Sequence, residues 1–379
     1  MAITLSKPPR SSWLNFFHDL VTVDFHQTDI YTGVRLATLL IIVTVLGLLT
    51  GHAAASSSVW LGAAYVLAVD QLRSNGPRTR FLLTVSILYA SIFAIGMGIS
   101  ISGNLVVPLC GLGLFIIAYF TIYPKAFWAL YFASLMFVIA IATQGATLAL
   151  AGQNFLLLFV GGLWAIVGGI IFPARKTSKQ QRTVTADPFQ EQHLPKLTWQ
   201  DRFRPLTSNL SIHSHHLQYA ILFAITGAVG MLIVQWFKLP EGDWVLITVV
   251  VILAAAFSDI SLTFRKVAHR IIGTIIGAVI ALIIIGNVHD IWLLSLLFFI
   301  FSVAFLSFVK IKNYAFFVIF MTVTILLFVE ISFPTTGPTA PLERIQNIFI
   351  GCVLSLVASS IWIAFRLKKS DLPLGRKGE

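Results

Sequence analysis

The sequence predicts an all-α integral membrane protein, with about twelve transmembrane helices arranged as two parallel six-helix repeats. Composition is the first reason: 57% of the 379 residues are hydrophobic and 11% are charged, whereas roughly a quarter of the residues in a soluble domain are charged. The second reason is that apolar residues form continuous runs instead of alternating with polar ones, which excludes a transmembrane β-barrel. The third is that landmark residues recur in the same order in both halves of the chain.

The apolar runs define the expected helices. About 20 consecutive apolar residues cross the roughly 30 Å hydrocarbon core of a bilayer. On this criterion the expected spans are residues 31–50, 57–72, 81–100, 105–122, 126–147, 154–173, 216–237, 243–258, 270–287, 289–309, 313–330 and 345–365.

The segment before the first span predicts a cytoplasmic amphipathic helix and no cleaved signal peptide. Trp13, Phe16 and Leu20 recur at the spacing of one helical face. Asp19 and Asp24 interrupt the apolar core that a signal peptide needs. Such a helix either lies on the membrane surface or packs against the protein's own loops, and the sequence leaves both open.

Cations fall on alternate loops of this arrangement, and that bias orients the chain. Lys and Arg occur in the N-terminal segment, the central loop, the C-terminal tail and four of the turns between spans. The loops on the opposite side carry two cations, Lys238 and Arg344. The positive-inside rule therefore places both termini and the central loop in the cytoplasm. The net charge of +11 then faces membrane lipids, and no nucleic acid is expected as a partner.

The chain reads as a duplicated six-span unit. Trp60 and Trp244 open the second span of each half, and Arg80 and Arg270 open the third. Because each copy has an even number of spans, both copies have the same orientation, and an axis along the membrane normal relates them. By analogy with other duplicated bundles, we expect a pathway at the junction between the copies. The expected domains are residues 1–30 (cytoplasmic amphipathic segment), 31–173 (first repeat), 174–215 (cytoplasmic linker), 216–366 (second repeat) and 367–379 (cytoplasmic tail).

One stretch carries a specific motif. Residues 244–283, WVLITVVVILAAAFSDISLTFRKVAHRIIGTIIGAVIALI, contain the pattern T-x-[RK]-[RK]-x-x-x-R-x-x-G-T-x-x-G after an aromatic-led span. This stretch resembles the hallmark of the fusaric acid resistance (FUSC) family. The matching residues are Trp244, Thr248, Thr263, Arg265, Lys266, Arg270, Gly273, Thr274 and Gly277. In the first half Arg80 matches, whereas Leu83 and Ile87 stand where the glycines would be.

The resemblance implies a transporter of the bacterial inner membrane that exports organic anions. Aromatic carboxylic acids are the favoured substrates, and proton coupling stays open. Distant relatives of the family are plant channels of the aluminium-activated malate type, so a passive anion channel is one alternative and a non-transporting membrane scaffold is another. The expected partners are a small organic anion and membrane lipids, and the sequence leaves open whether the chain forms a homo-oligomer.

Three charged residues within the spans are candidates for the pathway. A charged group deep in a bilayer costs at least about 2.5 kcal/mol on insertion scales, so such a group is a functional candidate. Arg35 lies one turn into the first span, Asp70 near the cytoplasmic end of the second, and Glu330 at the outer end of the eleventh. Each also lies near enough to an interface to reach water, and Arg73 is an ordinary ion-pair partner for Asp70.

Three arginines at helix entrances are further candidates: Arg80, Arg265 and Arg270. These residues either only mark the cytoplasmic side, or they also gather carboxylates at the mouth of an anion pathway. A planar guanidinium suits the second role because it binds a carboxylate through two parallel hydrogen bonds. Gly273 and Gly277, at GxxxG spacing, predict that another helix packs closely there.

No motif supports an enzyme, a cofactor or a metal site. The sequence has no G-x-x-x-x-G-K-[ST] phosphate-binding loop, no HExxH and no GxSxG, so ATP hydrolysis and the commonest hydrolase chemistries are not expected. His213, His215 and His216 form a cluster without a nearby Cys or carboxylate. A solvated turn is therefore favoured there over a metal site.

Overall fold

The computed structural model describes residues 29–72, 78–123, 126–143, 145–172, 199–211, 214–256, 260–308, 313–333 and 339–370. Within these residues the regular secondary structure is helical, with no strand. The predicted amphipathic helix at the N-terminus, most of the central linker and His213 lie outside the described residues.

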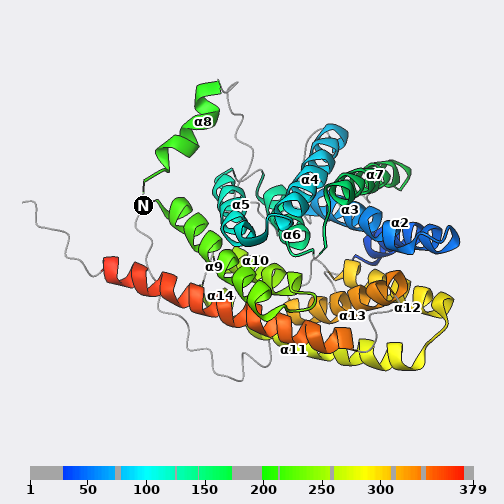
Figure 1. Ribbon diagram of the computed structural model, residues 1–379. Helices are drawn as coiled ribbons and strands as arrows, with labels where there is room; N and C mark the ends of the chain where they lie inside the picture. Colours follow the sequence, from blue (N-terminus) through cyan, green and yellow to red (C-terminus); the bar gives the residue numbers. More distant parts are fainter. Residues whose placement is uncertain are drawn as a thin grey trace, which may run out of the picture.

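Every expected span contains a helix (Figure 1). The helices of the first half are α2 (Ile30–Leu49), α3 (Ala53–Leu72), α4 (Arg78–Ser100), α5 (Val106–Phe120), α6 (Phe127–Ile141) and α7 (Leu148–Ile171). Those of the second half are α9 (His215–Phe237), α10 (Asp243–Ala256), α11 (Ile260–Asn287), α12 (Ile291–Ser307), α13 (Tyr314–Ser332) and α14 (Ala340–Ser370). Two short helices complete the set, η2 (Gly103–Leu105) between α4 and α5 and α8 (Trp199–Ser208) within the expected linker.

One boundary differs from the prediction in a way that affects the site. The span was expected from residue 270, but α11 begins at Ile260. The stretch TFRKVAHR contains no Gly or Pro that would end a helix, so its polar turns continue the helix although hydropathy excludes them from the span. Arg270 therefore lies well inside α11 and not at its start.

Polar side chains cap helices at their first turns. The side chain of Thr147 accepts a hydrogen bond from the backbone N–H of Leu150 at the start of α7, and Asp290 accepts one from Leu293 at the start of α12. The first N–H groups of a helix have no partner within it, and these caps satisfy one such group each.

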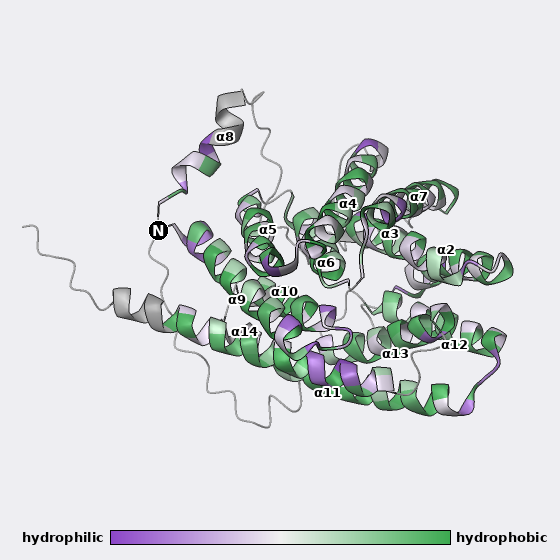
Figure 2. Cartoon of the chain, viewed as in Figure 1, coloured by the Kyte–Doolittle hydropathy of each residue, from purple (hydrophilic) through white to green (hydrophobic). Residues whose placement is uncertain are grey.

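The helices form a surface that suits a membrane. Nine of the described helices are long and apolar enough to cross a bilayer, and three shorter apolar helices, α6, α10 and α12, accompany them. Leu148, Ile170 and Trp236 are each more than half exposed, and Figure 2 shows hydrophobic residues along the helices of the bundle. Lipid covers such a surface more favourably than water does. The protein is therefore a multi-pass membrane protein.

Corresponding helices of the two halves pack against corresponding neighbours. In the first half α4 packs against α6 and α7, α3 against α7 and α2, and α5 against α6. In the second half α11 packs against α13 and α14, α10 against α14 and α9, and α12 against α13. Between the halves α5 packs against α9 and α2 against α12, while α6 contacts α10 and α3 contacts α13. Exchanging the two halves leaves this set of helix pairs unchanged.

The close approaches of two helix pairs also correspond. In α7 a Cβ on Gly161 would overlap the carbonyl oxygen of Val59 in α3. In α14 a Cβ on Gly351 would lie 2.6 Å from the carbonyl oxygen of Val245 in α10. Glycine is needed at both places because only its missing side chain lets the backbones approach so closely. When the two helix pairs are aligned on these contacts, Val245 corresponds to Val59. Trp244 then corresponds to Ser58, which is two residues before Trp60.

Aromatic rings join the halves near the middle of the bundle. The indole of Trp60 in α3 stacks on the ring of Phe328 in α13, with a centroid distance of 4.4 Å. Phe298 of α12 packs against both rings, at 6.4 Å and 5.7 Å. All three side chains are buried, so large apolar surface holds the two halves together at this level.

Candidate functional site

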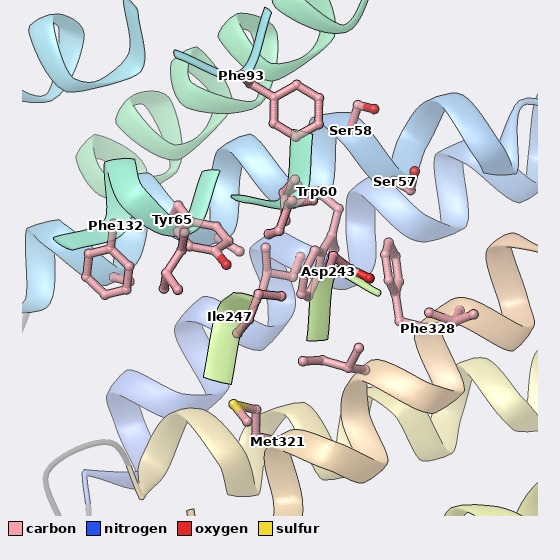
Figure 3. Close-up of a pocket in the computed structure, with 18 of the residues that line it drawn as sticks. Ser57, Ser58, Trp60, Tyr65, Phe93, Phe132, Asp243, Ile247, Met321 and Phe328 are labelled. Carbon is pink, nitrogen blue, oxygen red and sulfur yellow. The ribbon is translucent and has the colours of Figure 1, made fainter. Parts of the chain in front are cut away.

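A cavity of about 980 Å³ lies between the two halves. Most of its wall comes from α3 and α6 of the first half and from α10 and α13 of the second, which are corresponding helices by the packing described above. Figure 3 shows five of the aromatic residues around this space: Trp60, Tyr65, Phe93, Phe132 and Phe328. The wall is thus largely apolar and aromatic.

Three charged side chains line the cavity within the part of the chain that the structure describes: Asp243, Lys266 and Arg270. Asp243 is the first residue of α10, and Figure 3 labels it among the residues that line the cavity. We call the region around it the Asp243 end. Arg270 contacts Thr248, which lies five residues further along α10 and so about 7.5 Å away from Asp243. We call this second region the Arg270 end.

Arg270 is a buried cation that faces the cavity. Its side chain is 1% exposed. Its Nε donates a hydrogen bond to the Thr248 hydroxyl at 3.2 Å, and its Nη1 donates to the Tyr314 hydroxyl at 3.0 Å. Its Nη2 is buried and has no hydrogen-bond acceptor among the described residues. Leaving such an N–H group without an acceptor costs about 1–3 kcal/mol. An anion in the cavity would supply that acceptor.

Lys266 reinforces the positive charge at the Arg270 end. It lies four residues before Arg270, on the same face of α11. Its Nζ donates a hydrogen bond to the carbonyl oxygen of Val251 at 2.8 Å and lies 5.4 Å from the centroid of the Tyr314 ring. Asp243 is eight residues from Val251 along α10, or about 12 Å. Along the axis of α10, Asp243 is therefore displaced from the residues that the two cations contact.

Two glycines set the position of α11. A Cβ on Gly273 would lie 2.7 Å from the carbonyl oxygen of Ala315 in α13, and one on Gly277 would lie 2.7 Å from that of Ile319. The two helices consequently pack backbone to backbone. This packing holds Arg270, one turn before Gly273, beside Tyr314 of α13.

The other predicted pathway residues lie away from the cavity wall. Arg35 is buried in α2, and its Nη1 donates a hydrogen bond at 2.9 Å to the carbonyl oxygen of Phe172, the residue that ends α7. This bond ties two helices of the first half together. Asp70 and Glu330 are half-buried in α3 and α13, and neither lines the cavity. Transport roles for these residues stay predictions.

The remaining two arginines differ from Arg270 in their surroundings. Arg80 is exposed near the start of α4, and Arg265 is half-buried in α11. Neither side chain lines the cavity. Of the six charged candidates, Arg270 is the one that lies in the wall of the cavity.

The sequence marks a second buried arginine, Arg344, only as a cation on the outer side. Arg344, in the second turn of α14, is 0% exposed, and its Cζ lies 3.5 Å from the centroid of the Trp244 ring. None of its three guanidinium nitrogens has a hydrogen-bond acceptor in the described chain. The sequence does not single out Asp243, beside Trp244, either. Alignment of the two halves of the sequence is the signal that points to Arg344, because it pairs this residue with Asn154, which lines the cavity.

Comparison with known proteins covers the region that carries this site. Residues 227–358 match the fusaric acid resistance protein-like family. This match confirms the resemblance drawn from the motif at 244–283, and it includes Lys266, Arg270 and Arg344. The region that is similar to this family extends from within α9 to within α14.

A curated relative extends this comparison. An uncharacterized protein of Synechocystis sp., slr1298, is 30% identical over 163 residues. The match covers 42% of this chain but 20% of that protein, so the chain spans about a fifth of the length of this relative. No solved structure matches the chain.

Proposed function

We propose that the protein is a membrane transporter that exports organic anions, preferentially aromatic carboxylates, through the cavity between its halves. The observation that carries this proposal is the buried guanidinium of Arg270, which lines the cavity with Nη2 free of any described acceptor. A buried cation in a membrane protein is costly unless an anion or a polar partner compensates it. The family match supports a role in membrane transport.

The lining favours an anion with an aromatic body. A carboxylate binds a guanidinium through charge-assisted hydrogen bonds, and Lys266 adds a second positive charge beside it. The aromatic residues along the wall offer ring faces and edges to a substrate ring. The volume, about 980 Å³, lies in the range of roughly 300–1,000 Å³ that is usual for sites that take small molecules.

The architecture that we propose for this function is twelve spans in two parallel six-helix repeats. The correspondence of helix pairs between the halves supports the duplication. Six spans per copy would give both copies one orientation and place the relating axis along the membrane normal, through the cavity. The positive-inside bias supports an inner-membrane location with both termini in the cytoplasm. A reporter fused after Glu379 that is active only outside the cell would contradict this orientation.

A carrier fits the cavity better than a channel or a scaffold does. A channel for anions needs a continuous polar or cationic lining, whereas this wall is mostly apolar and its two cations lie together. The function of a non-transporting scaffold does not require a buried cation that faces a cavity. We further propose that Asp243 carries the coupling proton, because it is the one carboxylate that lines the cavity among the described residues.

The test is flux of a defined aromatic acid through purified protein. Liposomes that contain the protein are loaded with radiolabelled benzoate, and its efflux is compared with that from empty liposomes. We expect efflux by the wild type and an approximately hundredfold loss in Arg270→Gln, because a charge-assisted hydrogen bond contributes about 1.5–3 kcal/mol. Arg265→Gln removes the same charge from the same helix but outside the cavity wall, and it should keep efflux. Wild-type efflux equal to that of empty liposomes would refute the proposed function.

A further inference from the structure

The buried guanidinium of Arg344 does not line the cavity. It is 0% exposed, stacks on Trp244 at 3.5 Å, and has no hydrogen-bond acceptor for Nε, Nη1 or Nη2 among the described residues. Arginine carries five N–H donors, and burying them without acceptors is costly. A desolvated cation–π contact with an indole contributes about 2 kcal/mol or more. The stack alone leaves the donors unsatisfied.

The matching place in the first half is open to the cavity. There the hydroxyl of Ser58 donates a hydrogen bond to the side-chain oxygen of Asn154, and both residues line the cavity. When the two helix pairs are aligned on their glycine contacts, Ser58 corresponds to Trp244, and Asn154 corresponds to Arg344. In the second half the larger Trp244 lines the cavity in place of a serine, and Arg344 lies against its ring without reaching the wall. The indole therefore separates the guanidinium from the cavity.

Acidic neighbours distinguish this cation from Arg270. Arg344 interacts electrostatically with Arg270 and, in addition, with the carboxyl groups of Glu241 and Asp243. Glu241 lies in the loop before α10, where burial raises the pKa of its carboxyl group and the charge of Arg344 opposes that shift. Arg270 has the cation Lys266 beside it in the cavity wall. Thr248, the hydrogen-bond partner of Arg270, is about 7.5 Å from Asp243 along α10. An anion should consequently bind Arg344 more weakly than Arg270.

We propose that Arg344 is a second carboxylate-binding residue, at the Asp243 end, that receives the substrate when the indole of Trp244 moves off the guanidinium. This inference rests on the proposed function. A transported anion needs sites that hold it firmly enough to enter and weakly enough to leave. Arg270 with Lys266 supplies the stronger site on the cytoplasmic side, and Arg344, weakened by Glu241 and Asp243, supplies the release site.

Exchange of benzoate across oriented vesicles tests this assignment. Labelled benzoate on one side exchanges for unlabelled benzoate on the other, which needs no net proton movement. We expect Arg344→Gln to raise the half-saturating benzoate concentration at the Asp243 end by about tenfold or more, as expected for one lost charge-assisted hydrogen bond. At the Arg270 end that concentration should stay within about twofold. Lys238→Gln is the matched control, because it removes the exposed cation of the same side, and it should change neither value.

A double variant separates binding from charge balance. If Arg344 only neutralises Asp243, the combination Arg344→Gln with Asp243→Asn restores the half-saturating concentration, and that result would overturn the proposal. If Arg344 binds substrate, the value stays raised in the double variant.

Should Arg344→Gln fail to accumulate in membranes, Trp244→Ala replaces it. Removal of the cover should lower the half-saturating concentration at the Asp243 end, and an unchanged or higher value would refute the assignment. Absence of exchange by the wild type would instead refute the proposed function.

Discussion

The two halves of the molecule pair their helices in the same way but differ in chemistry. Arg80 and Arg270 open the third apolar segment of each half, yet Arg80 is exposed near the start of α4 whereas Arg270 is buried in the cavity wall. In the second half Gly273 and Gly277 bring α11 against the backbone of α13. The first half has Leu83 and Ile87 at those places in the motif, and both side chains are exposed. Two halves whose helices make matching contacts can thus line one cavity with different side chains.

The largest expected contrast between the halves is in the two arginines. Arg270→Lys should insert normally but lose benzoate efflux by about a hundredfold, because a single ammonium nitrogen cannot occupy the separate positions of Nε and Nη1, which bind Thr248 and Tyr314, and that of Nη2. Arg80→Lys should keep wild-type efflux, and Lys266→Arg should keep it too. Efflux is measured at matched membrane abundance. Equal efflux by wild type and Arg270→Lys would make Arg270 a marker of topology only.

The glycines should give the next largest contrast. Gly277→Leu introduces a side chain where a Cβ already lies 2.7 Å from a backbone oxygen of α13, and such overpacking costs about 1–3 kcal/mol or more. The unfolding midpoint in detergent should fall clearly. Ile87→Leu at the matching place in α4, which is 46% exposed, should leave the midpoint unchanged. A stable Gly277→Leu protein would mean that the close approach of α11 and α13 does not matter for folding.

The smallest expected effect concerns the residue that positions Arg270. Thr248→Val removes the acceptor of Arg270 Nε at nearly constant volume, so the half-saturating benzoate concentration should rise about fivefold with little change in maximal rate. Thr248→Ser should restore it. Thr226→Val in α9, where the hydroxyl donates a hydrogen bond to the carbonyl of Leu222 in the same helix, is the control. An equal rise in the control would point to a general effect of losing a buried hydroxyl.

The helices were predictable because span length and hydropathy are local properties of the sequence. The start of α11 was not, since its polar turns at Arg265 and Lys266 read as a loop when hydropathy is the criterion. The cavity was not predictable in detail either, because its wall combines α3 and α6 with α10 and α13, and only packing brings these together. Asp243 and Arg344 near the starts of two helices looked like ordinary interfacial charges, and it is the folded chain that buries Arg344.

The central claim is that the substrate carboxylate binds Arg270 in the cavity between the halves. The most direct test is a structure of the purified protein with 4-iodobenzoate, whose iodine marks the position and direction of the molecule. We predict the ligand in the cavity, with a carboxylate oxygen about 2.7–2.9 Å from Arg270 Nη2 and the ring against the aromatic wall. Iodobenzoate bound elsewhere, with the cavity empty in protein that transports it, would contradict the account.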